Sequence, residues 1–160
     1  MSVLTMITEA VSTVPEVSVE QLQRELAAGK VLLLDVRDLP ERWAQGTIRG
    51  AMHVSRGTLE WYADPRCPYH QDRPFLDPNR RTITFSMVGE RSAVAAHSLL
   101  KLGYRDVASF APGLFGWIAA GLEIEAVPVQ TKFPDLEFPD EKTMLSYLSL
   151  PPRDGHAAQK

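Results

Sequence analysis

Residues 82–102, TITFSMVGERSAVAAHSLLKL, decide the fold. The first four residues are β-branched or aromatic and predict a strand over 82–85. Farther on, Ala93, Ala96 and Leu99 recur at helical spacing, and Gly103 follows as a stop signal. The stretch therefore predicts a strand, a short loop over 86–92 and a helix.

The rest of the chain repeats this alternation of strand and helix. Short apolar or β-branched runs predict further strands over 31–34, 51–54 and 107–110. Capping residues and closing glycines predict further helices over 18–29, 38–46 and 113–121. Strands that alternate with helices predict an α/β fold with a parallel sheet.

Composition and charge narrow the class of protein. The chain has 160 residues, of which 44% are apolar and 23% charged, as expected for one globular domain. Its net charge of −3 disfavours nucleic acid as a partner, and no apolar run is long enough to span a membrane. Residues 1–9 lack the features of a secretory signal, so we expect a cytoplasmic protein.

Cys67 is the single cysteine of the chain, which excludes an internal disulfide and a multi-cysteine metal site. It lies in a proline-rich connection with no helix N-terminus behind it, so we interpret it as a non-catalytic thiol. The sequence indicates no nucleotide, flavin or metal site, and we expect no cofactor. The chain is expected to be a monomer or a homodimer.

The chain divides into three predicted parts. A loose arm is expected over 1–16, the domain over 17–127 and a tail over 128–160. An insertion at about 56–80 interrupts the domain, where prolines break the pattern and one helical turn is predicted at 59–62. The tail is rich in proline and acid, and its apolar stretch 144–150 is expected to pack back on the domain or to pair with a second copy.

The loop over 86–92 has the features of an anion site. Ligands gather at the carboxyl ends of strands in an open parallel sheet, and a helix N-terminus offers free N–H groups to an anion. Gly89 lets the backbone curl, and Arg91 adds a planar cation that suits sulfate, thiosulfate or phosphate. Taken alone, however, the loop favours the plainer interpretation of a turn with a surface arginine and a capping serine.

Three blocks of sequence, in order, resemble the rhodanese homology domain over about residues 18–125. The first is Asp35-Val36-Arg37 with Glu41, Gly46, Ile48 and Gly50-Ala51; the second is Gly89-x-Arg91-Ser92-Ala93 with Ala95-Ala96 and Gly103-Tyr104; the third is Pro112-Gly113 with Trp117 and Gly121. The resemblance implies a three-layer α/β fold in which helices flank a central parallel sheet of five strands. Residues 56–65 with 68–70 also resemble an insertion in a subset of bacterial single-domain rhodaneses.

The resemblance implies a sulfurtransferase of the thiosulfate sulfurtransferase family. In that family a loop cysteine takes sulfur from thiosulfate as a persulfide and passes it to cyanide or a thiol. The implied partners are a small sulfur oxyanion, such as thiosulfate or sulfate, and a thiol acceptor protein. The short spacing from Ser86 to Arg91 fits this activity, whereas related phosphatases have a longer loop.

The resemblance also assigns roles to individual residues. Ser86, at the nucleophile position, and Arg91 are the catalytic candidates. The anion-binding candidates are Met87, Val88, Gly89, Glu90 and Ser92. Asp35 and Arg37 are expected to support the site, although a purely structural salt bridge is the plainer interpretation.

Ser86 departs from the family pattern, because it stands where the chemistry needs a cysteine. A thiol with a pKa of about 8.5 can become a thiolate beside a helix N-terminus, but a serine hydroxyl is far less acidic. Serine also cannot form a persulfide. Ser86 is therefore either native, in a pseudoenzyme or interaction module, or a deliberate replacement of a natural cysteine. The bulk of Met87 and Val88 and the charge of Glu90 favour the first explanation.

Overall fold

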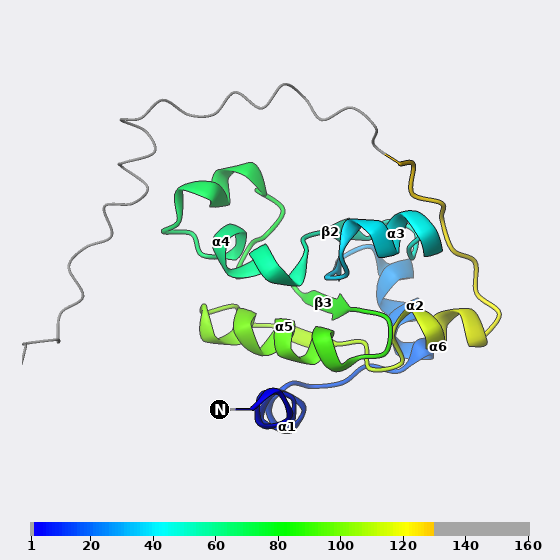
Figure 1. The fold of residues 1–160 in the computed structure, drawn as a ribbon, viewed down its shortest axis with the longest axis horizontal. Helices are drawn as coiled ribbons and strands as arrows, with labels where there is room; N and C mark the ends of the chain where they lie inside the picture. Colours follow the sequence, from blue (N-terminus) through cyan, green and yellow to red (C-terminus); the bar gives the residue numbers. More distant parts are fainter. Residues whose placement is uncertain (1, 130–160) are drawn as a thin grey trace, which may run out of the picture. The chain divides into compact units, whose positions relative to one another are not determined.

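A parallel sheet of four strands forms the centre of the computed structural model, which describes residues 2–129 (Figure 1). The strands are β1 (Leu32–Asp35), β2 (Met52–His53), β3 (Thr82–Phe85) and β4 (Val107–Ser109), in the spatial order β2-β1-β3-β4. Asp35 pairs with His53 on one side and with Phe85 on the other, so three strands end together at one edge. The loop over 86–92 begins at this edge.

Helices cover both faces of the sheet. They are α1 (Val3–Thr13), α2 (Val19–Ala28), α3 (Leu39–Gln45), α4 (Leu59–Ala63), α5 (Glu90–Lys101) and α6 (Gly113–Ala119). Leu32 and Leu34 of β1 face one core cluster, which includes residues of α4 and α5. Leu33 faces a second cluster, which includes residues of α2 and α6. The strand is buried on both faces, which explains its continuous apolar run.

The predicted caps set the ends of two helices. The Ser18 hydroxyl accepts the N–H of Gln21 at the start of α2, and Gly29 ends that helix in the left-handed conformation. At the start of α3, the side chain of Glu41 accepts the N–H of Asp38 at 3.1 Å. The predictions for these two helices are confirmed.

The prediction of a fifth strand is wrong for residues 2–129. The position beside β4 is taken by a single bridge, in which Ser109 donates its N–H to the Pro15 carbonyl and accepts the N–H of Val17. Proline has no N–H to extend the ladder on one side, and Ser18 begins α2 on the other. The segment between them is too short for a strand.

The prediction of a loose arm over 1–16 is also wrong, because residues 3–13 form helix α1. The Ser2 hydroxyl caps the helix by accepting the N–H of Thr5 at 3.1 Å. The helix packs crosswise against α5, with Ala10 fully buried (Figure 1). Only Ala10 of the helix is buried, and Val3, Leu4, Met6 and Val11 stay exposed.

The insertion has more helix than the single turn predicted for it. Two 3-10 helices, η1 (Arg56–Thr58) and η2 (Pro68–Asp72), flank α4. Pro68 begins η2, where its missing N–H costs nothing. The Tyr104 hydroxyl, donating to the Ala63 carbonyl at 3.1 Å, ties the insertion to the core.

The predicted apolar segment 144–150 lies outside the described residues, and the predicted domain boundary near residue 128 stays a prediction. Within residues 2–129, no helix has both the length and the apolar character that a membrane span requires.

Candidate functional site

The loop over 86–92 is held in place by the segment that leads into α6. The N–H of Leu114 donates to the Ser86 carbonyl at 2.9 Å, and the N–H of Phe115 donates to the Met87 carbonyl at 3.1 Å. Gly113 between these contacts has a φ of +62°, and a Cβ there would lie 2.4 Å from the Met87 carbonyl oxygen. Only glycine allows this close approach of the two segments.

Gly89 gives the loop its curl, as predicted. Its φ of +96° lies in the region that disfavours L side chains, and a Cβ would lie 2.3 Å from the Ala111 carbonyl oxygen. The glycine therefore satisfies a conformational and a packing requirement at once. Immediately after it, α5 begins at Glu90.

A row of free backbone donors lines the curl. None of the N–H groups of residues 87–92 donates to an acceptor in the described part of the chain, whereas the N–H of Ala93 donates to the Gly89 carbonyl. The first turn of a helix leaves such donors unpaired, and the helix dipole adds a partial positive charge there. The loop therefore has the backbone geometry of an anion site.

Ser86 lies at the floor of this curl and is only 1% exposed. Its carbonyl is used by Leu114, but its hydroxyl has no hydrogen-bond partner among residues 2–129. Every polar side-chain atom of the described residues that is fully buried has a hydrogen-bond partner. Because the Ser86 hydroxyl has none, it must still contact solvent. No base among these residues is placed to take its proton.

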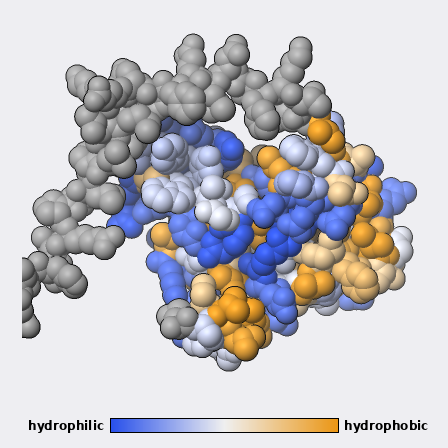
Figure 2. Space-filling model, viewed as in Figure 1, coloured by the Kyte–Doolittle hydropathy of each residue, from blue (hydrophilic) through white to orange (hydrophobic). Residues whose placement is uncertain are grey.

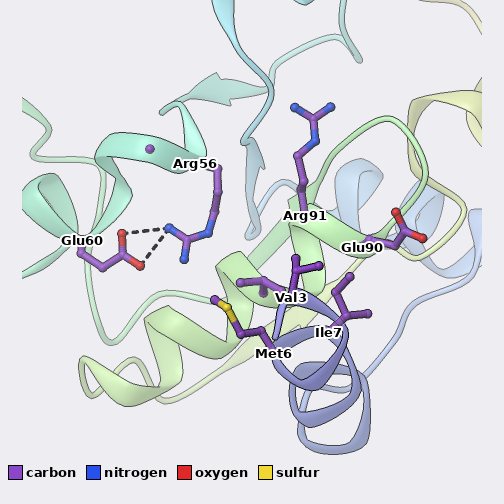
Figure 3. Close-up of a pocket in the computed structure, with 9 residues that line it drawn as sticks. Val3, Met6, Ile7, Arg56, Glu60, Glu90 and Arg91 are labelled. Carbon is purple, nitrogen blue, oxygen red and sulfur yellow. Dashed lines mark hydrogen bonds and ion pairs between the residues drawn. The ribbon is translucent and has the colours of Figure 1, made fainter. Parts of the chain in front are cut away.

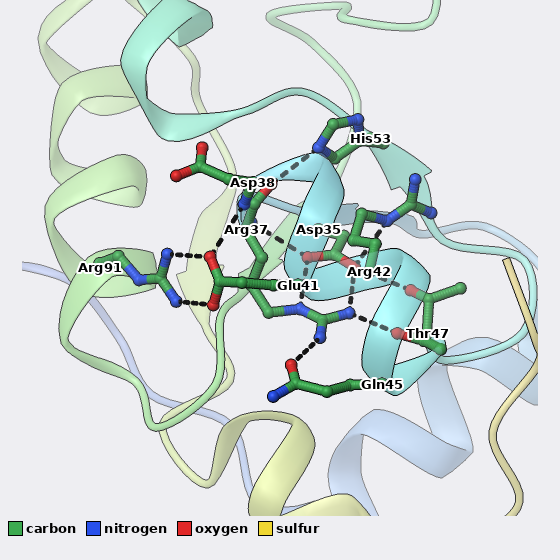
Figure 4. A network of polar contacts seen from close by, with 10 residues as sticks. Asp35, Arg37, Asp38, Glu41, Arg42, Gln45, Thr47, His53 and Arg91 are labelled. Carbon is green, nitrogen blue, oxygen red and sulfur yellow. Dashed lines mark hydrogen bonds and ion pairs between the residues drawn. The ribbon is translucent and has the colours of Figure 1, made fainter. Parts of the chain in front are cut away.

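The guanidinium of Arg91 was predicted to bind an anion, but in the structure it is bound by Glu41 (Figure 4). Nη1 donates to Oε2 at 2.7 Å and Nη2 to Oε1 at 2.6 Å. These hydrogen bonds lower the pKa of the Glu41 carboxyl to about 2, against the opposing effect of burial. The same contacts raise the pKa of Arg91. The pair is bidentate and keeps the arginine charge largely neutralised.

Asp35 and Arg37 form a buried ion pair between the end of β1 and α3, and both are fully inaccessible to solvent (Figure 4). Asp35 also accepts hydrogen bonds from Arg42 Nε at 3.0 Å and from the Thr47 hydroxyl at 2.8 Å. Arg37 donates to the Gly46 carbonyl at 2.7 Å, which fixes the end of α3. The structure thus favours the plainer interpretation of these residues, in which they brace α3 and do not touch a ligand.

The other predicted site residues lie in different surroundings. The Ser92 hydroxyl is committed to the Gly89 carbonyl at 2.7 Å and to the Ser109 hydroxyl at 2.9 Å, so only its N–H is free for a ligand. Met87 packs against the core cluster below α6. Val88 is 55% exposed, and Glu90 is also exposed.

Glu41 is the site residue that sequence reasoning missed, because its position three residues after Asp38 indicates only a cap for the helix over 38–46 and not a pair with Arg91. It performs both tasks, because Oε2 accepts the Asp38 N–H and also an Arg91 donor. Arg91 is 50 positions away in the chain, and no local pattern predicts such a pair. Among the described residues, no group of three side chains suited to a metal ion is present.

Comparison with known proteins gives one family. The family model described as Rhodanese-like domain matches residues 18–120. Thiosulfate:glutathione sulfurtransferase of Homo sapiens is 30% identical over 109 residues, which are 65% of this chain and 93% of the human protein. The putative sulfur carrier protein YrkF of Bacillus subtilis is 28% identical over 110 residues, which are 68% of this chain but only 54% of that protein.

Solved structures agree with the family match. RPA3614 of Rhodopseudomonas palustris, a protein of unknown function described as a possible tyrosine phosphatase, is 29% identical with a TM-score of 0.72. The match covers 78% of this chain and 95% of that one. The human single-domain sulfurtransferase TSTD1 is 28% identical with a TM-score of 0.58, over 66% of this chain and 96% of that one.

Proposed function

This chain belongs to the rhodanese-like domain family, and from that premise we propose that it binds a small sulfur oxyanion, such as thiosulfate or sulfate, without transferring sulfur. The observation that supports this function is the row of unpaired N–H groups of residues 87–92 around the Ser86 hydroxyl. An oxyanion would give these donors acceptors at the N-terminus of α5.

Serine chemistry accounts for the missing transfer step. In the cysteine enzymes, a thiolate attacks the outer sulfur of thiosulfate, the S–S bond of thiosulfate breaks and sulfite leaves with the electron pair. The new S–S bond on the enzyme is then broken by cyanide or a thiol, which restores the thiolate. Ser86 can neither ionise readily near neutral pH nor hold a persulfide.

In this proposal Arg91 does not bind the anion directly, because Glu41 already accepts both of its guanidinium donors. A site built mainly from backbone donors, with little uncompensated positive charge, binds a dianion more weakly than one with a free arginine. We therefore expect dissociation constants in the millimolar range. In this proposal Ser86 and the N–H groups of Met87, Val88, Gly89, Glu90 and Ser92 contact the anion.

Calorimetry of the full chain with thiosulfate, sulfate and phosphate at constant ionic strength tests the proposal. We expect saturable binding of thiosulfate and sulfate, and full recovery of the thiosulfate after cyanide is added. Absence of binding at millimolar anion would contradict the anion site. Formation of thiocyanate by the unchanged chain would contradict the loss of transfer.

The main alternative is an active sulfurtransferase whose natural cysteine has been replaced by Ser86. The intact curl of the loop and the names of the human and Bacillus subtilis relatives support it. Under this alternative a thiol compound or thiol protein accepts the sulfur. A cytoplasmic location is part of both proposals, because a chain with one cysteine needs no compartment that forms disulfides.

A further inference from the structure

A cavity of about 540 Å³ lies beside the loop, between α1, the start of α5 and the η1–α4 segment (Figure 3). Glu90 and Arg91, which line it, also belong to the loop over 86–92. The cavity and the proposed anion site therefore share residues. Its volume suits a small organic molecule rather than an inorganic anion alone.

Helix α1 supplies the apolar wall of this cavity. Val3, Met6 and Ile7 are spaced to lie on one side of the helix, and all three line the cavity. Val3 is 66% exposed and Met6 is 38% exposed, so this apolar surface is not covered by the described chain. Figure 2 shows the apolar character of the α1 surface beneath the domain. Helix α1 also lies outside the residues that match the family model.

The charged residues of the cavity are already paired or are acidic. Arg56 donates to Glu60 at 2.8 Å and to the Ser98 hydroxyl at 3.0 Å. Arg91 is held by Glu41, as described above. Glu90 makes no ion pair with another described residue. The cavity thus has no uncompensated cation to hold carboxylates of a ligand, and an uncharged body fits it best.

We propose that this cavity binds the uncharged alkyl or aryl body of an organic sulfur oxyanion, a sulfonate or thiosulfonate, whose anionic head lies against the loop N–H groups. The placement of the head rests on the proposed function. The placement of the body rests on the α1 wall, the paired arginines and the residues that the cavity shares with the loop. Helix α1 is then a specificity element added to the family domain.

Alkanesulfonates of increasing length measure the contribution of the cavity to binding. We expect butanesulfonate to bind the full chain roughly tenfold more tightly than methanesulfonate. Three fully buried methylenes would give about sixtyfold, but part of the butyl chain stays in water at this open cavity. Calorimetry with inorganic sulfate, under the same conditions, reports the anion head separately.

Two substitutions on α1 form a matched pair. Met6→Gln places a polar group of similar size in the cavity wall and should remove most of the gain from the butyl chain. Leu4→Gln makes a comparable change on the same helix, at a residue that is 72% exposed and does not line the cavity, and should preserve the gain. Sulfate binding should be the same in both variants.

Gly57→Leu tests the cavity from its opposite wall without changing α1. Gly57 lines the cavity, and a Cβ there would meet no atom within 4 Å. A leucine at this position fills the space, so butanesulfonate should lose its advantage while sulfate binding persists. Circular dichroism and thermal unfolding confirm that each variant is folded.

The outcomes separate this proposal from the proposed function. Sulfate binding without a gain from the alkyl chain, or an equal gain in Met6→Gln and Leu4→Gln, would overturn the cavity proposal alone. A gain that depends on Met6, without any binding of inorganic sulfate, would overturn the anion loop and support the cavity. Failure of every anion to bind would overturn both.

Discussion

Ser86 presents a hydroxyl with no partner among the described residues, at the point where the backbone donors of the loop converge. An unpaired hydroxyl in a nearly buried position carries a desolvation cost unless water or a ligand satisfies it. An anion in the loop would accept from this hydroxyl and from the N–H groups together. The serine is thus compatible with the binding that we propose, in which no covalent step takes place.

The contact between Arg91 and Glu41 also determines how strongly the loop can attract an anion. Their two short hydrogen bonds neutralise the one guanidinium that belongs to the loop. The side chains remain 40% and 31% exposed, so solvent screens the pair and its net contribution to stability is modest. The larger effect of the pair is electrostatic: the Glu41 carboxylate offsets the positive charge with which Arg91 would attract an anion.

Glu41→Gln should strengthen thiosulfate binding several-fold, because it removes the carboxylate that competes with the anion for Arg91. We also expect a loss of up to about 1 kcal/mol in the free energy of unfolding, since the pair is partly exposed. Calorimetry and urea denaturation measure the two effects.

Glu25→Gln is the matched control for this prediction. Glu25 also holds an arginine, Arg81, through two hydrogen bonds of 2.9 Å, but this pair lies near the amino end of β3, away from the loop. It should lower stability to a similar extent without changing thiosulfate binding. Equal binding in Glu41→Gln and the unchanged chain would contradict the role given to Arg91.

The strand–loop–helix element from β3 to α5 is shaped by close backbone approaches. Two N–H groups at the start of α6 fix the carbonyls of Ser86 and Met87, and glycines at 89 and 113 permit the contact. With its carbonyls held on this side, the loop leaves its N–H groups unpaired. The shape of the proposed anion site is thus a consequence of packing between this loop and residues 111–115.

Gly89→Ala should lower the free energy of unfolding by more than about 2 kcal/mol and abolish thiosulfate binding, because it combines a disfavoured φ with a backbone clash. Gly103→Ala is the control: its φ is +93°, but a Cβ there would meet nothing within 4 Å. It should cost only about 1 kcal/mol and leave binding intact. Equal losses in the two variants would show that the Ala111 contact is unimportant.

For the whole domain, titratable groups predict how stability changes with pH. Contacts with Arg91 lower the pKa of Glu41 from 4.5 to about 2, so its stabilising effect is complete above pH 4.5 and is lost as the pH falls towards 2. Burial lowers the pKa of His53 below 6.5, so the neutral ring favours the folded state above pH 6.5 and its effect also declines on acidification.

Both groups act in the same direction, so the urea midpoint should fall continuously as the pH is lowered from about 7 to about 3. In Glu41→Gln the decline below pH 4.5 should be shallower, because this group no longer takes up a proton on unfolding. A midpoint that rises on acidification would contradict the assigned directions of the pKa shifts.

Much of the domain could be predicted from the sequence, because its signals are local. Capping residues fixed α2 and α3, and buried apolar runs located the strands. Helix α1 was missed, and only Ala10 of its residues is buried. The fifth strand was predicted but is absent from residues 2–129, where only Glu16 pairs at that edge. These features depend on tertiary contacts that no short window of sequence contains.

The candidate site divides in the same way. The curl at Gly89 and the start of α5 followed from local patterns. Three other features did not follow from local patterns. They are the pairing of Arg91 with Glu41, the hydrogen bonds of the Ser92 hydroxyl with the Gly89 carbonyl and the Ser109 hydroxyl, and the α1 wall of the cavity. Each depends on which neighbour is present in the folded chain.

Production of thiocyanate from thiosulfate and cyanide by Ser86→Cys tests the central claim most directly. The loop keeps its backbone donors, so we predict that this variant forms thiocyanate while the unchanged chain forms none, and that adding Cys67→Ser makes no difference to either. Thiocyanate formation by the unchanged chain would contradict the account. So would an inert Ser86→Cys variant that still folds and binds thiosulfate.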